Sequence, residues 1–505
     1  MDTLIHDLRI AVRSLWRAPA FTIAAVLTLA VGIGANTAIF SVVDGVLLRA
    51  APFANVDRLL MVWQTDRTSG TTREPSSIPD YRDFLEQSRS FSQLAAFTPA
   101  ELNLTRRDAD PVRVPALAVT HQFLQMVDIK PVAGRLLTEE ETRENGVRSV
   151  LISEPLAMEI FTGSAAAIGQ SILLNDVAWT VVGVLPRAAD FGTLQVLSSA
   201  AYQRGFAERG EKTRVDVWVG LRPSATSTRD SHGVFVMGKL APGATPVTAQ
   251  SEMTRIATDL ERTYPSNVNR GVHVEHLESV VFGGVRPALL VLLGSVALVL
   301  LVACGNVANL MLVRGAHRMR EVTVRIALGA GSTRLLRQFL AESLVLCLSG
   351  AVLGVLLAEA GLQALLSLAP STLPRVDSVG INGRVLFATL AISILVAVAF
   401  SCLPVLQGRR RNLQGSLRGV TTDNQSGRRN RGNARSVLVV AELAIAVMLV
   451  VGAGLMMRSL GALQGVNPGF ETSGILKAEF QLPASRYPQE QSAFPNWTAS
   501  ARFFR

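Results

Sequence analysis

Cysteine is scarce in this sequence of 505 residues, which has three: Cys304, Cys347 and Cys402. Each cysteine lies inside a long apolar run, and the polar stretch 50–286 has none. That stretch of 237 residues therefore has no disulfide and must be stabilised by its own hydrophobic core. The sequence also has no Cys/His cluster with the spacing of a metal site.

Motifs of nucleotide-binding and hydrolytic sites are also absent. The glycine-rich stretch 329–333 reads GAGST and lacks the lysine of a phosphate-binding loop. The sequence contains neither a GxSxG nor an HExxH pattern. Six histidines are scattered along it, and we interpret His273 and His276 as surface residues. We therefore expect no catalytic, cofactor-binding or metal-binding residues in this chain.

Charged residues make up only 17% of the chain, hydrophobic residues make up 49%, and the mean hydropathy is +0.32. Three runs of 23, 27 and 22 residues lack Asp, Glu, Lys and Arg: Phe21–Val43, Pro287–Val313 and Val385–Leu406. Two more, Phe339–Leu366 and Val437–Met457, are interrupted only by glutamates. About 20 apolar residues cross a bilayer as a helix, so five membrane spans are predicted. The first run is longer than a signal-peptide core, although a cleavage site at Ala50-Ala51 stays an alternative.

The arginines are distributed unevenly among the segments that flank these runs. Residues 1–20 contain three arginines, 314–337 contain six and 407–436 contain eight, whereas 367–384 contains two. Because basic residues gather on the cytoplasmic side, the first three segments are predicted to be cytoplasmic and 50–286 external. The net charge of +10 is thus a topology signal, and no nucleic-acid partner is expected.

The external stretch mixes strand and helix patterns. Ser149–Ile152 and Ala178–Leu185 are rich in β-formers, and the turn-forming pair 175–176 precedes the second. Asp80–Phe97 and Val247–Tyr264 have helical patterns. The fold class is therefore an α-helical membrane bundle of about five spans, with a large α+β domain inserted between spans 1 and 2.

Small and amide side chains inside the spans are candidates for helix packing. Gly32 and Gly34 form a small-residue surface that allows close approach of another helix. We expect Asn36 and Asn306 to form hydrogen bonds between neighbouring helices rather than to bind a ligand.

The segment Arg314–Glu342 is basic and lies between two apolar runs. As a helix, it places Met319, Val322 and Ile326 on one apolar stripe, after which Gly329 allows a turn back into the membrane. This pattern suits a short surface helix that contacts a soluble partner. A basic loop that only follows the positive-inside rule is an equally open alternative.

Several motifs together resemble the MacB-like and FtsX-like ABC transporter permeases. REVTVRIALGAG at 320–331, followed by LLRQFLAES at 335–343, resembles the first loop of those permeases. The opening stretch 13–48 is similar to the bacterial branch with duplicated permease units. GRLLTEEE at 134–141 and the stretches 168–186 and 239–253 resemble the MacB-like periplasmic core domain. The resemblance covers nearly the whole chain, and the combination of motifs is specific.

The resemblance implies a domain order. It consists of a cytoplasmic amphipathic helix (1–20), a first span (21–48), a periplasmic core domain (50–286), an FtsX-like permease domain (287–406, with spans 287–313, 335–366 and 385–406 and a coupling segment 314–334), a basic flexible linker (407–436), a fifth span (437–457) and the start of a second periplasmic domain (458–505).

It also implies a mechanism in which a separate cytoplasmic ATPase binds ATP and the permease transmits its closure to the periplasmic domain. The residues carried over as the ATPase contact are Arg320, Glu321, Val324, Arg325, Leu328 and Gly329. Further expected partners are a second permease unit, the lipid bilayer and a periplasmic or outer-membrane protein. The expected substrate is hydrophobic or amphipathic.

The sequence departs from the family in two ways. MacB carries a fused nucleotide-binding domain before its first span, where this chain has 20 residues, so the ATPase is expected on another polypeptide. A fifth span follows the four-span unit, so the chain resembles the first half of a duplicated permease, truncated at residue 505.

Two other functions stay as alternatives. The first is a non-transporting regulator of a periplasmic enzyme, as in FtsX-type systems. The second is a proton-coupled transporter that uses Glu342, Glu359 and Glu442, because ionisable residues in spans are costly and often functional. The large external insert disfavours this second alternative.

Overall fold

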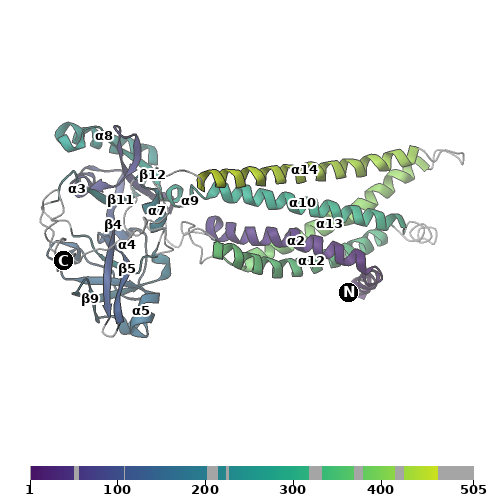
Figure 1. Cartoon of the computed structure of the whole chain (residues 1–505), viewed down its shortest axis with the longest axis horizontal. Helices are drawn as coiled ribbons and strands as arrows, with labels where there is room; N and C mark the ends of the chain where they lie inside the picture. Colours follow the sequence, from purple (N-terminus) through teal and green to yellow (C-terminus); the bar gives the residue numbers. More distant parts are fainter. Residues whose placement is uncertain are drawn as a thin grey trace, which may run out of the picture. The chain divides into compact units, whose positions relative to one another are not determined.

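The computed structural model describes residues 2–49, 56–106, 109–190, 192–201, 214–222, 227–317, 332–368, 379–415 and 426–464. Within these residues the chain forms two units, shown in Figure 1. The helical unit is built from residues up to Arg49 and from Val285 onward, and the inserted domain lies within Ala50–Gly284. Each unit has its own hydrophobic core.

The helical unit contains five helices long and apolar enough to cross a membrane, which confirms the predicted spans. The helices are α1 (Asp2–Trp16), α2 (Pro19–Val43) with a π-helical extension η1 (Asp44–Leu48), α10 (Arg286–His317), α12 (Ser332–Leu368), α13 (Gly383–Gly415) and α14 (Ser426–Gln464). The candidate spans within them are Pro19–Leu48, Arg286–Met311, Arg337–Ser367, Gly383–Phe400 and Val439–Ser459.

Helix α2 lies at the centre of this unit and contacts α10, α12 and α13. Its buried side chains include Ala25, Leu29 and Ile33, which pack with residues of α10, α12 and α13 in one cluster. Helix α14 runs beside α10, and none of its candidate span is buried within the chain (Figure 1). The other spans pack around α2, whereas α14 lies at the edge.

The basic stretch 407–436 differs from its predicted flexible conformation at both ends. Helix α13 continues to Gly415, and α14 begins at Ser426, which leaves 416–425 outside the described residues. Arginine is a good helix former, and extending an existing helix avoids the cost of nucleation. The neighbouring spans therefore continue as helices into the basic sequence.

The inserted domain is built on a 12-stranded mixed sheet in the order β12-β1-β11-β4-β5-β10-β7-β9-β6, with β2, β3 and β8 paired beside it. The pairs β5 with β10 and β7 with β9 are parallel, whereas β1 with β11, β11 with β4 and β4 with β5 are antiparallel. The strands are β1 (Leu59–Asp66), β2 (Thr71–Glu74), β3 (Ser76–Ser77), β4 (Phe91–Arg106), β5 (Ala109–Val119), β6 (Ala133–Gly134), β7 (Ser149–Ser153), β8 (Ser171–Leu174), β9 (Val177–Leu185), β10 (Val217–Gly220), β11 (His232–Leu240) and β12 (Arg270–His276).

Helices cover both faces of this sheet. Along β1, Met61 and Trp63 enter one core cluster while Leu60 and Val62 enter another, so the strand reads as a continuous apolar run. The clusters take in side chains of α3 (Ile78–Gln87), α4 (Gln122–Met126), α5 (Glu154–Phe161), α6 (Ser164–Ala167), α7 (Thr193–Ser199), α8 (Pro246–Thr263) and α9 (Leu277–Phe282). The α+β prediction is thereby confirmed.

The predicted helix over Asp80–Phe97 is wrong in its second half. Helix α3 ends at Gln87 and β4 begins at Phe91. The carboxylate of Glu252 on α8 accepts hydrogen bonds from the backbone N–H groups of Arg89 (2.8 Å) and Ser90 (2.7 Å), which fixes the chain after the helix. Residues more than 160 positions apart in the sequence thus meet where this helix ends, and a local sequence pattern cannot predict such a contact.

Two other local predictions agree with the structure. The strands predicted at Ser149–Ile152 and Ala178–Leu185 are β7 and β9. The turn residues Asn175 and Asp176 both have positive φ, 49° and 63°, and join β8 to β9 in a tight hairpin.

Candidate functional site

The residues expected to contact an ATPase lie outside the described residues. Arg320, Glu321, Val324, Arg325, Leu328 and Gly329 all fall between the end of α10 at His317 and the start of α12 at Ser332. What the structure describes is the helical framework on both sides of this coupling segment. The candidate functional site is therefore built here from the contacts that hold that framework, with α2 at its centre.

One end of α2 is held by Arg314 near the C-terminus of α10. Its Nη2 donates to the carbonyl oxygen of Ser14 (2.8 Å) and to the Ser14 hydroxyl (3.0 Å). Its guanidinium also lies over the ring of Phe21, 4.6 Å from the centroid. We name these contacts the Arg314 clamp. Because Ser14 belongs to α1 and Phe21 to α2, the clamp fixes the corner between those helices to the helix that enters the coupling segment.

The same corner is strengthened by Thr22. Its hydroxyl donates to the carbonyl oxygens of Leu15 (2.9 Å) and Ala18 (3.0 Å). Pro19 begins α2, where a proline costs little because the N–H that it lacks has no helical partner. The side chains of Ala11 and Leu15 are buried, so one face of α1 is fully used in packing on the bundle.

The middle of α2 approaches its neighbours through glycine. A Cβ added to Gly34 would lie 2.8 Å from the carbonyl oxygen of Gly354 on α12, which leaves no room for a side chain. A Cβ on Gly32 would lie 3.1 Å from both Ala303 and Leu300 on α10. Gly32 and Gly34 thus lie at close approaches to two different helices.

The partner surface on α12 is a signal that our sequence reasoning missed. Gly350 and Gly354 are four residues apart in an apolar helix, the GxxxG spacing of close membrane-helix pairs. A Cβ on Gly350 would lie 2.8 Å from the Cβ of Leu29. The pattern GAVLG in the third apolar run was sufficient to predict this surface.

The two candidate asparagines have different surroundings. Asn36 is buried, and its Nδ2 donates to the carbonyl oxygen of Gly32 in its own helix (2.9 Å) and to that of Val296 on α10 (2.7 Å). Asn306 is exposed on α10 and does not pack between helices in the described part of the chain. Only Asn36 therefore has the interhelical hydrogen bond that we expected.

The other end of α2 is held by a buried carboxylate that our sequence reasoning also missed. Asp44 is 2% exposed and begins the π-helical turn η1. Its Oδ2 accepts a hydrogen bond from Asn382 Nδ2 (2.8 Å) and lies 3.6 Å from Arg49 Nε. The Asn382 Oδ1 accepts from the backbone N–H of Arg384 (2.8 Å) and Val385 (3.1 Å) at the start of α13. We name this group the Asp44 latch.

A second polar contact joins α2 and α13 inside the bundle. The hydroxyls of Thr37 and Thr389 lie 2.9 Å apart, and both side chains are buried. Each hydroxyl also bonds a carbonyl in its own helix, so neither helix buries an unsatisfied group here. The Asp44 latch and this contact together tie α2 to α13.

The three glutamates of the proton-transfer alternative lie in different surroundings. Glu342 is 5% exposed, whereas Glu359, also on α12, is exposed and accepts a bond from Gln363 one turn away (3.4 Å). Glu442 on α14 packs against Gly305 of α10. Glu342 and Glu359 are 17 residues apart on one helix, about 25 Å along its axis, which is too far for direct proton transfer between them.

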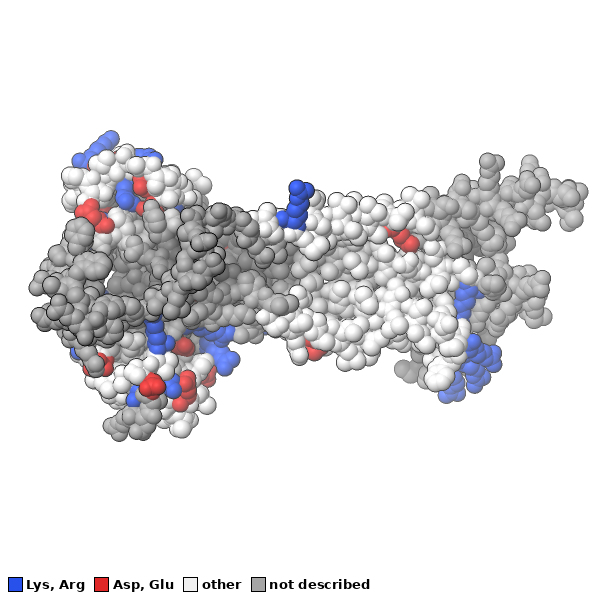
Figure 2. All heavy atoms as spheres, in the orientation of Figure 1, with Lys and Arg blue, Asp and Glu red and all other residues white. Residues whose placement is uncertain are grey.

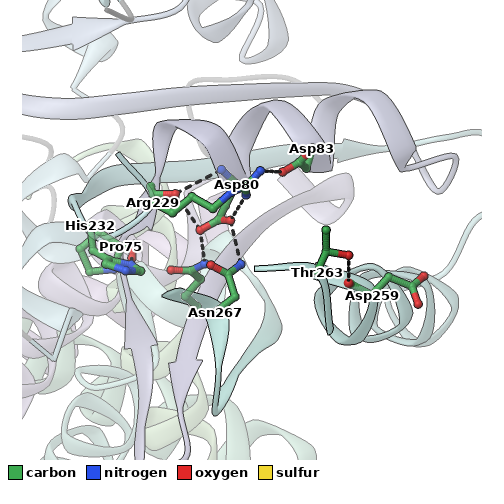
Figure 3. A network of polar contacts seen from close by, with 10 residues as sticks. Pro75, Asp80, Asp83, Arg229, His232, Asp259, Thr263 and Asn267 are labelled. Carbon is green, nitrogen blue, oxygen red and sulfur yellow. Dashed lines mark hydrogen bonds and ion pairs between the residues drawn. The ribbon is translucent and has the colours of Figure 1, made fainter. Parts of the chain in front are cut away.

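The inserted domain contains a buried charge network, shown in Figure 3. Asp80 is fully buried and accepts hydrogen bonds from Gln64 (2.8 Å), Ser77 (2.7 Å) and Asn267 (2.9 Å). Arg229 places Nη1 2.6 Å from Asp80 Oδ1 and Nη2 2.6 Å from an oxygen of Asp83. The network ties β1, α3 and the segment after α8 together, which suits a rigid body more than a reactive centre.

A second carboxylate, Glu141, is held within the motif GRLLTEEE. Both Nη atoms of Arg135 donate to it (2.8 Å each), as do the backbone N–H and hydroxyl of Thr138 and the hydroxyl of Ser149. Burial alone would raise the pKa of Glu141, but these hydrogen bonds outweigh it and lower the pKa to about 2. Glu141 is therefore ionised at neutral pH and serves as a structural anchor.

The described residues contain no group of three or more His, Cys, Asp or Glu side chains that could hold a metal ion. The buried carboxylates Asp80 and Glu141 each accept several hydrogen bonds, and the closest backbone approaches lie between helices of the bundle. The arrangement is suited to holding α2 in a fixed position against α10, α12 and α13.

Comparisons with known proteins identify two matching families. The MacB-like periplasmic core domain matches residues 22–256, and the FtsX-like permease C-terminal domain matches residues 293–413. The macrolide export ATP-binding/permease protein MacB of Shewanella sp. (strain ANA-3) is 27% identical over 270 residues, which cover 52% of this chain and 37% of that protein. MacB of Neisseria gonorrhoeae (strain ATCC 700825 / FA 1090) is 25% identical over 358 residues, which cover 69% of this chain and 49% of that protein.

A solved structure is also similar. The crystal structure of the periplasmic region of MacB from Actinobacillus actinomycetemcomitans has 12% identity and a TM-score of 0.32, covering 45% of this chain and 94% of that one. The matched part of this chain spans less than half of the length of the two MacB relatives named above.

Proposed function

We propose a function from the premise that this chain belongs to the MacB-like and FtsX-like ABC transporter permeases. It acts as a permease subunit that couples ATP hydrolysis by a separate cytoplasmic ATPase to motion of the inserted domain. The motion exports or releases a hydrophobic or amphipathic substrate on the periplasmic side.

The observation that carries the proposal is the position of α2 between two polar anchors. The Arg314 clamp holds its N-terminal end to the helix that leads into the coupling segment, and the Asp44 latch holds its C-terminal end to α13. Chain continuity joins α2 and η1 to the inserted domain within about ten residues. A movement of the coupling segment can therefore be passed along α2, and the chain continues from the end of η1 into that domain.

The ATPase contact is assigned to the coupling segment. Arg320, Glu321 and Arg325 supply polar pairing, Val324 and Leu328 fill an apolar groove, and Gly329 permits the turn. The assignment follows from the resemblance of 320–331 to the family motif and from the location of this segment between α10 and α12. These residues bind the partner, and ATP itself is held by the ATPase.

The proposed orientation places the N-terminus and the coupling segment in the cytoplasm and the inserted domain in the periplasm of an inner-membrane multi-pass protein. The arginine-rich segments 1–20, 314–337 and 407–436 support it through the positive-inside rule. A second permease unit, either another copy or the other half of a longer chain, completes the assembly around an ATPase dimer. A periplasmic or outer-membrane protein is a further partner in the proposal.

The deciding experiment is purification from native membranes in mild detergent, with mass spectrometry of the retained proteins. We expect a P-loop ATPase to co-purify and to be lost in Glu321→Arg or Arg325→Glu. The matched control is Arg418→Glu, the same charge change in the other basic segment, and it should retain the ATPase. A stable complex that lacks an ATPase would refute the proposal.

The same preparation distinguishes transport from regulation. Retention of a secreted hydrolase, together with no substrate efflux from reconstituted vesicles, would favour the FtsX-type regulator instead. Gly329→Pro should abolish stimulation of the ATPase while membrane insertion survives, because proline stiffens the turn that glycine permits. Normal coupling in that variant would remove Gly329 from the mechanism.

A further inference from the structure

The face of α1 that points away from the bundle, together with the turn that follows the helix, carries three arginines and an exposed tryptophan. Ala11, Ser14 and Leu15 are buried, whereas Arg9, Val12, Arg13, Trp16 and Arg17 are exposed. At 100° per residue, the exposed set occupies one continuous face, and the buried set occupies the opposite face. The Arg314 clamp holds Ser14, so α1 cannot rotate without breaking both of its hydrogen bonds.

This arrangement differs from an ordinary amphipathic surface helix. In such a helix the apolar side chains enter the membrane and the charges point to water. Here Ala11 and Leu15 are already used in packing on the bundle, and the free face combines arginines with Trp16, which is 82% exposed. A large aromatic side chain exposed to water is unfavourable, whereas the interface of a bilayer is the site where tryptophan is enriched.

The position of α1 along the bundle places this face at a membrane surface. Candidate span Pro19–Leu48 begins three residues after Trp16, so the tryptophan lies within a turn of the hydrocarbon boundary. Figure 2 shows few charged atoms on the visible side of the helical unit, with the larger group of Lys and Arg atoms near the end where the N-terminus lies in Figure 1 and a smaller group toward the opposite end. The three arginines thus lie at headgroup depth.

From this geometry we infer that the exposed face of α1 binds the headgroups of anionic phospholipids. Arg9, Arg13 and Arg17 are spaced four residues apart, so their guanidinium groups follow one edge of the helix. Guanidinium pairs with phosphate through two parallel hydrogen bonds, which makes arginine the preferred side chain for this ligand. Trp16 lies beside Arg9 around the helix, on the side away from Arg13, and occupies the acyl–headgroup boundary.

Lipid binding at this place has a consequence for the framework. The headgroups hold α1, and α1 holds Arg314 at the base of the coupling segment. A bound anionic lipid layer therefore gives the corner a fixed support against which the coupling segment moves. Lipid binding by α1 does not depend on which soluble partner binds the coupling segment.

The test uses the full chain reconstituted in nanodiscs of phosphatidylcholine with increasing fractions of phosphatidylglycerol. Retained lipids are counted by native mass spectrometry after transfer to detergent. We expect phosphatidylglycerol to be enriched, and replacing Arg9, Arg13 and Arg17 by glutamine to lower the enrichment by about fivefold for each arginine. Arginine-to-lysine variants at the same positions keep the charge and should keep part of the enrichment.

A matched control removes the same charge elsewhere. Replacing Arg67, Arg143 and Arg262 by glutamine removes three exposed arginines of the inserted domain and should leave the enrichment unchanged. Equal retention of both lipids by the wild-type chain would overturn the inference. So would full enrichment in the variant that lacks Arg9, Arg13 and Arg17.

A second readout locates the lipid at the tryptophan. Brominated phosphatidylglycerol should quench part of the tryptophan fluorescence, and Trp16→Phe should remove that part without loss of membrane insertion. If quenching is equal in wild type and Trp16→Phe, the lipid lies elsewhere and the inference fails. If an added ATPase binds the wild type but not the arginine-to-glutamine variant, and no lipid preference exists, the face belongs to the ATPase.

Discussion

At the scale of single residues, the carboxylates of the inserted domain show how charge is used for rigidity. Glu141 is 6% exposed and is surrounded by donors from three neighbours in the chain. Its pKa of about 2 means that the folded domain stabilises the ionised carboxylate of Glu141 relative to the protonated carboxyl. This difference makes the stability of the domain depend on pH.

Glu141→Gln should lower the free energy of unfolding by about 2 kcal/mol at neutral pH, because hydrogen bonds to a charged group are lost. The folded pKa lies below the unfolded value, so this stabilisation is full above pH 4.5 and is lost as pH falls towards 2. Urea unfolding of both proteins, followed by tryptophan fluorescence at several pH values, checks this. The difference in free energy of unfolding between wild type and Glu141→Gln should shrink below pH 4.5.

The control for this prediction is Glu139→Gln. Glu139 pairs with Arg143 on the surface, where both side chains are more than half exposed. Its removal should leave the free energy of unfolding nearly unchanged, because solvent screens this surface pair. If the difference in free energy of unfolding between wild type and Glu141→Gln grows as the pH falls, the role assigned to Glu141 is wrong.

Asp80→Asn should be the more damaging change, because it leaves a buried guanidinium without its main partner. Asp80 is fully buried, and the Arg229 side chain that pairs with it is only 15% exposed. Removing one member of a buried pair costs about 3–5 kcal/mol. The measurement is again urea unfolding, with Asp259→Asn on the half-exposed surface of α8 as the control. Equal midpoints for the two variants would show that the network does not stabilise the domain.

At the scale of whole elements, the central feature is the close pairing of α2 with α12. A Cβ added to Gly34 or Gly350 would lie 2.8 Å from an atom of the facing helix, and one added to Gly354 would lie 3.1 Å away, so the two backbones approach closely. Small residues are favoured at such interfaces because apolar side chains gain little from leaving lipid, whereas close backbone packing adds van der Waals contacts. The pairing determines where α2 lies and therefore where both of its anchored ends lie.

Gly34→Leu should separate these helices and lower the stability of the helical unit by about 1–3 kcal/mol. A Cβ at this position would already lie 2.8 Å from the carbonyl oxygen of Gly354. Thermal inactivation in detergent, followed by loss of the monodisperse peak in gel filtration, is the measurement. Gly452→Leu on α14 is the control, because nothing lies within 4 Å of its added Cβ. If both variants lose stability equally, the close approach is not what holds the bundle.

At the scale of the whole molecule, the proposed mechanism needs α2 to move as one rigid piece. Its C-terminal turn is π-helical, and such turns are uncommon and often found at functional positions. Asp44 begins that turn and is joined to the start of α13 by Asn382. In the proposed mechanism, the Asp44 latch determines whether a movement of α2 is passed on or absorbed in its last turn.

Asp44→Ala and Asn382→Ala should each uncouple the proposed ATPase from this chain without releasing it. Loss of a hydrogen bond to a charged group, worth about 1.5–3 kcal/mol, is expected to lower the stimulated ATPase rate about fivefold or more. The loss in the double variant should be smaller than the product of the two single losses, because both substitutions remove the same contact. ATPase rates in nanodiscs, with retention measured by pull-down, check this. Asn306→Ala, an exposed asparagine on α10, is the control, and a loss of equal size there would refute the role of the latch.

The sequence by itself determined the features that depend on local composition. A run of about 20 apolar residues is stable in a bilayer only as a helix, so the five spans followed without knowledge of their neighbours. The positive φ values at Asn175 and Asp176 likewise suit those residues locally, and the hairpin could be predicted. The small residues Gly32 and Gly34 could be recognised as a packing surface, although not the helices that they meet.

Only the tertiary structure decided which distant polar groups meet. Arg314 and Ser14 are 300 residues apart, and Asn382 and Asp44 are 338 apart, so no local pattern pairs them. Glu252 ends α3 from another helix for the same reason. The free face of α1 also follows only from the structure, because packing on the bundle uses Ala11 and Leu15 and leaves Trp16 with the arginines. Local physics selects helices and turns, whereas the pairing of buried polar groups depends on how the whole chain satisfies them.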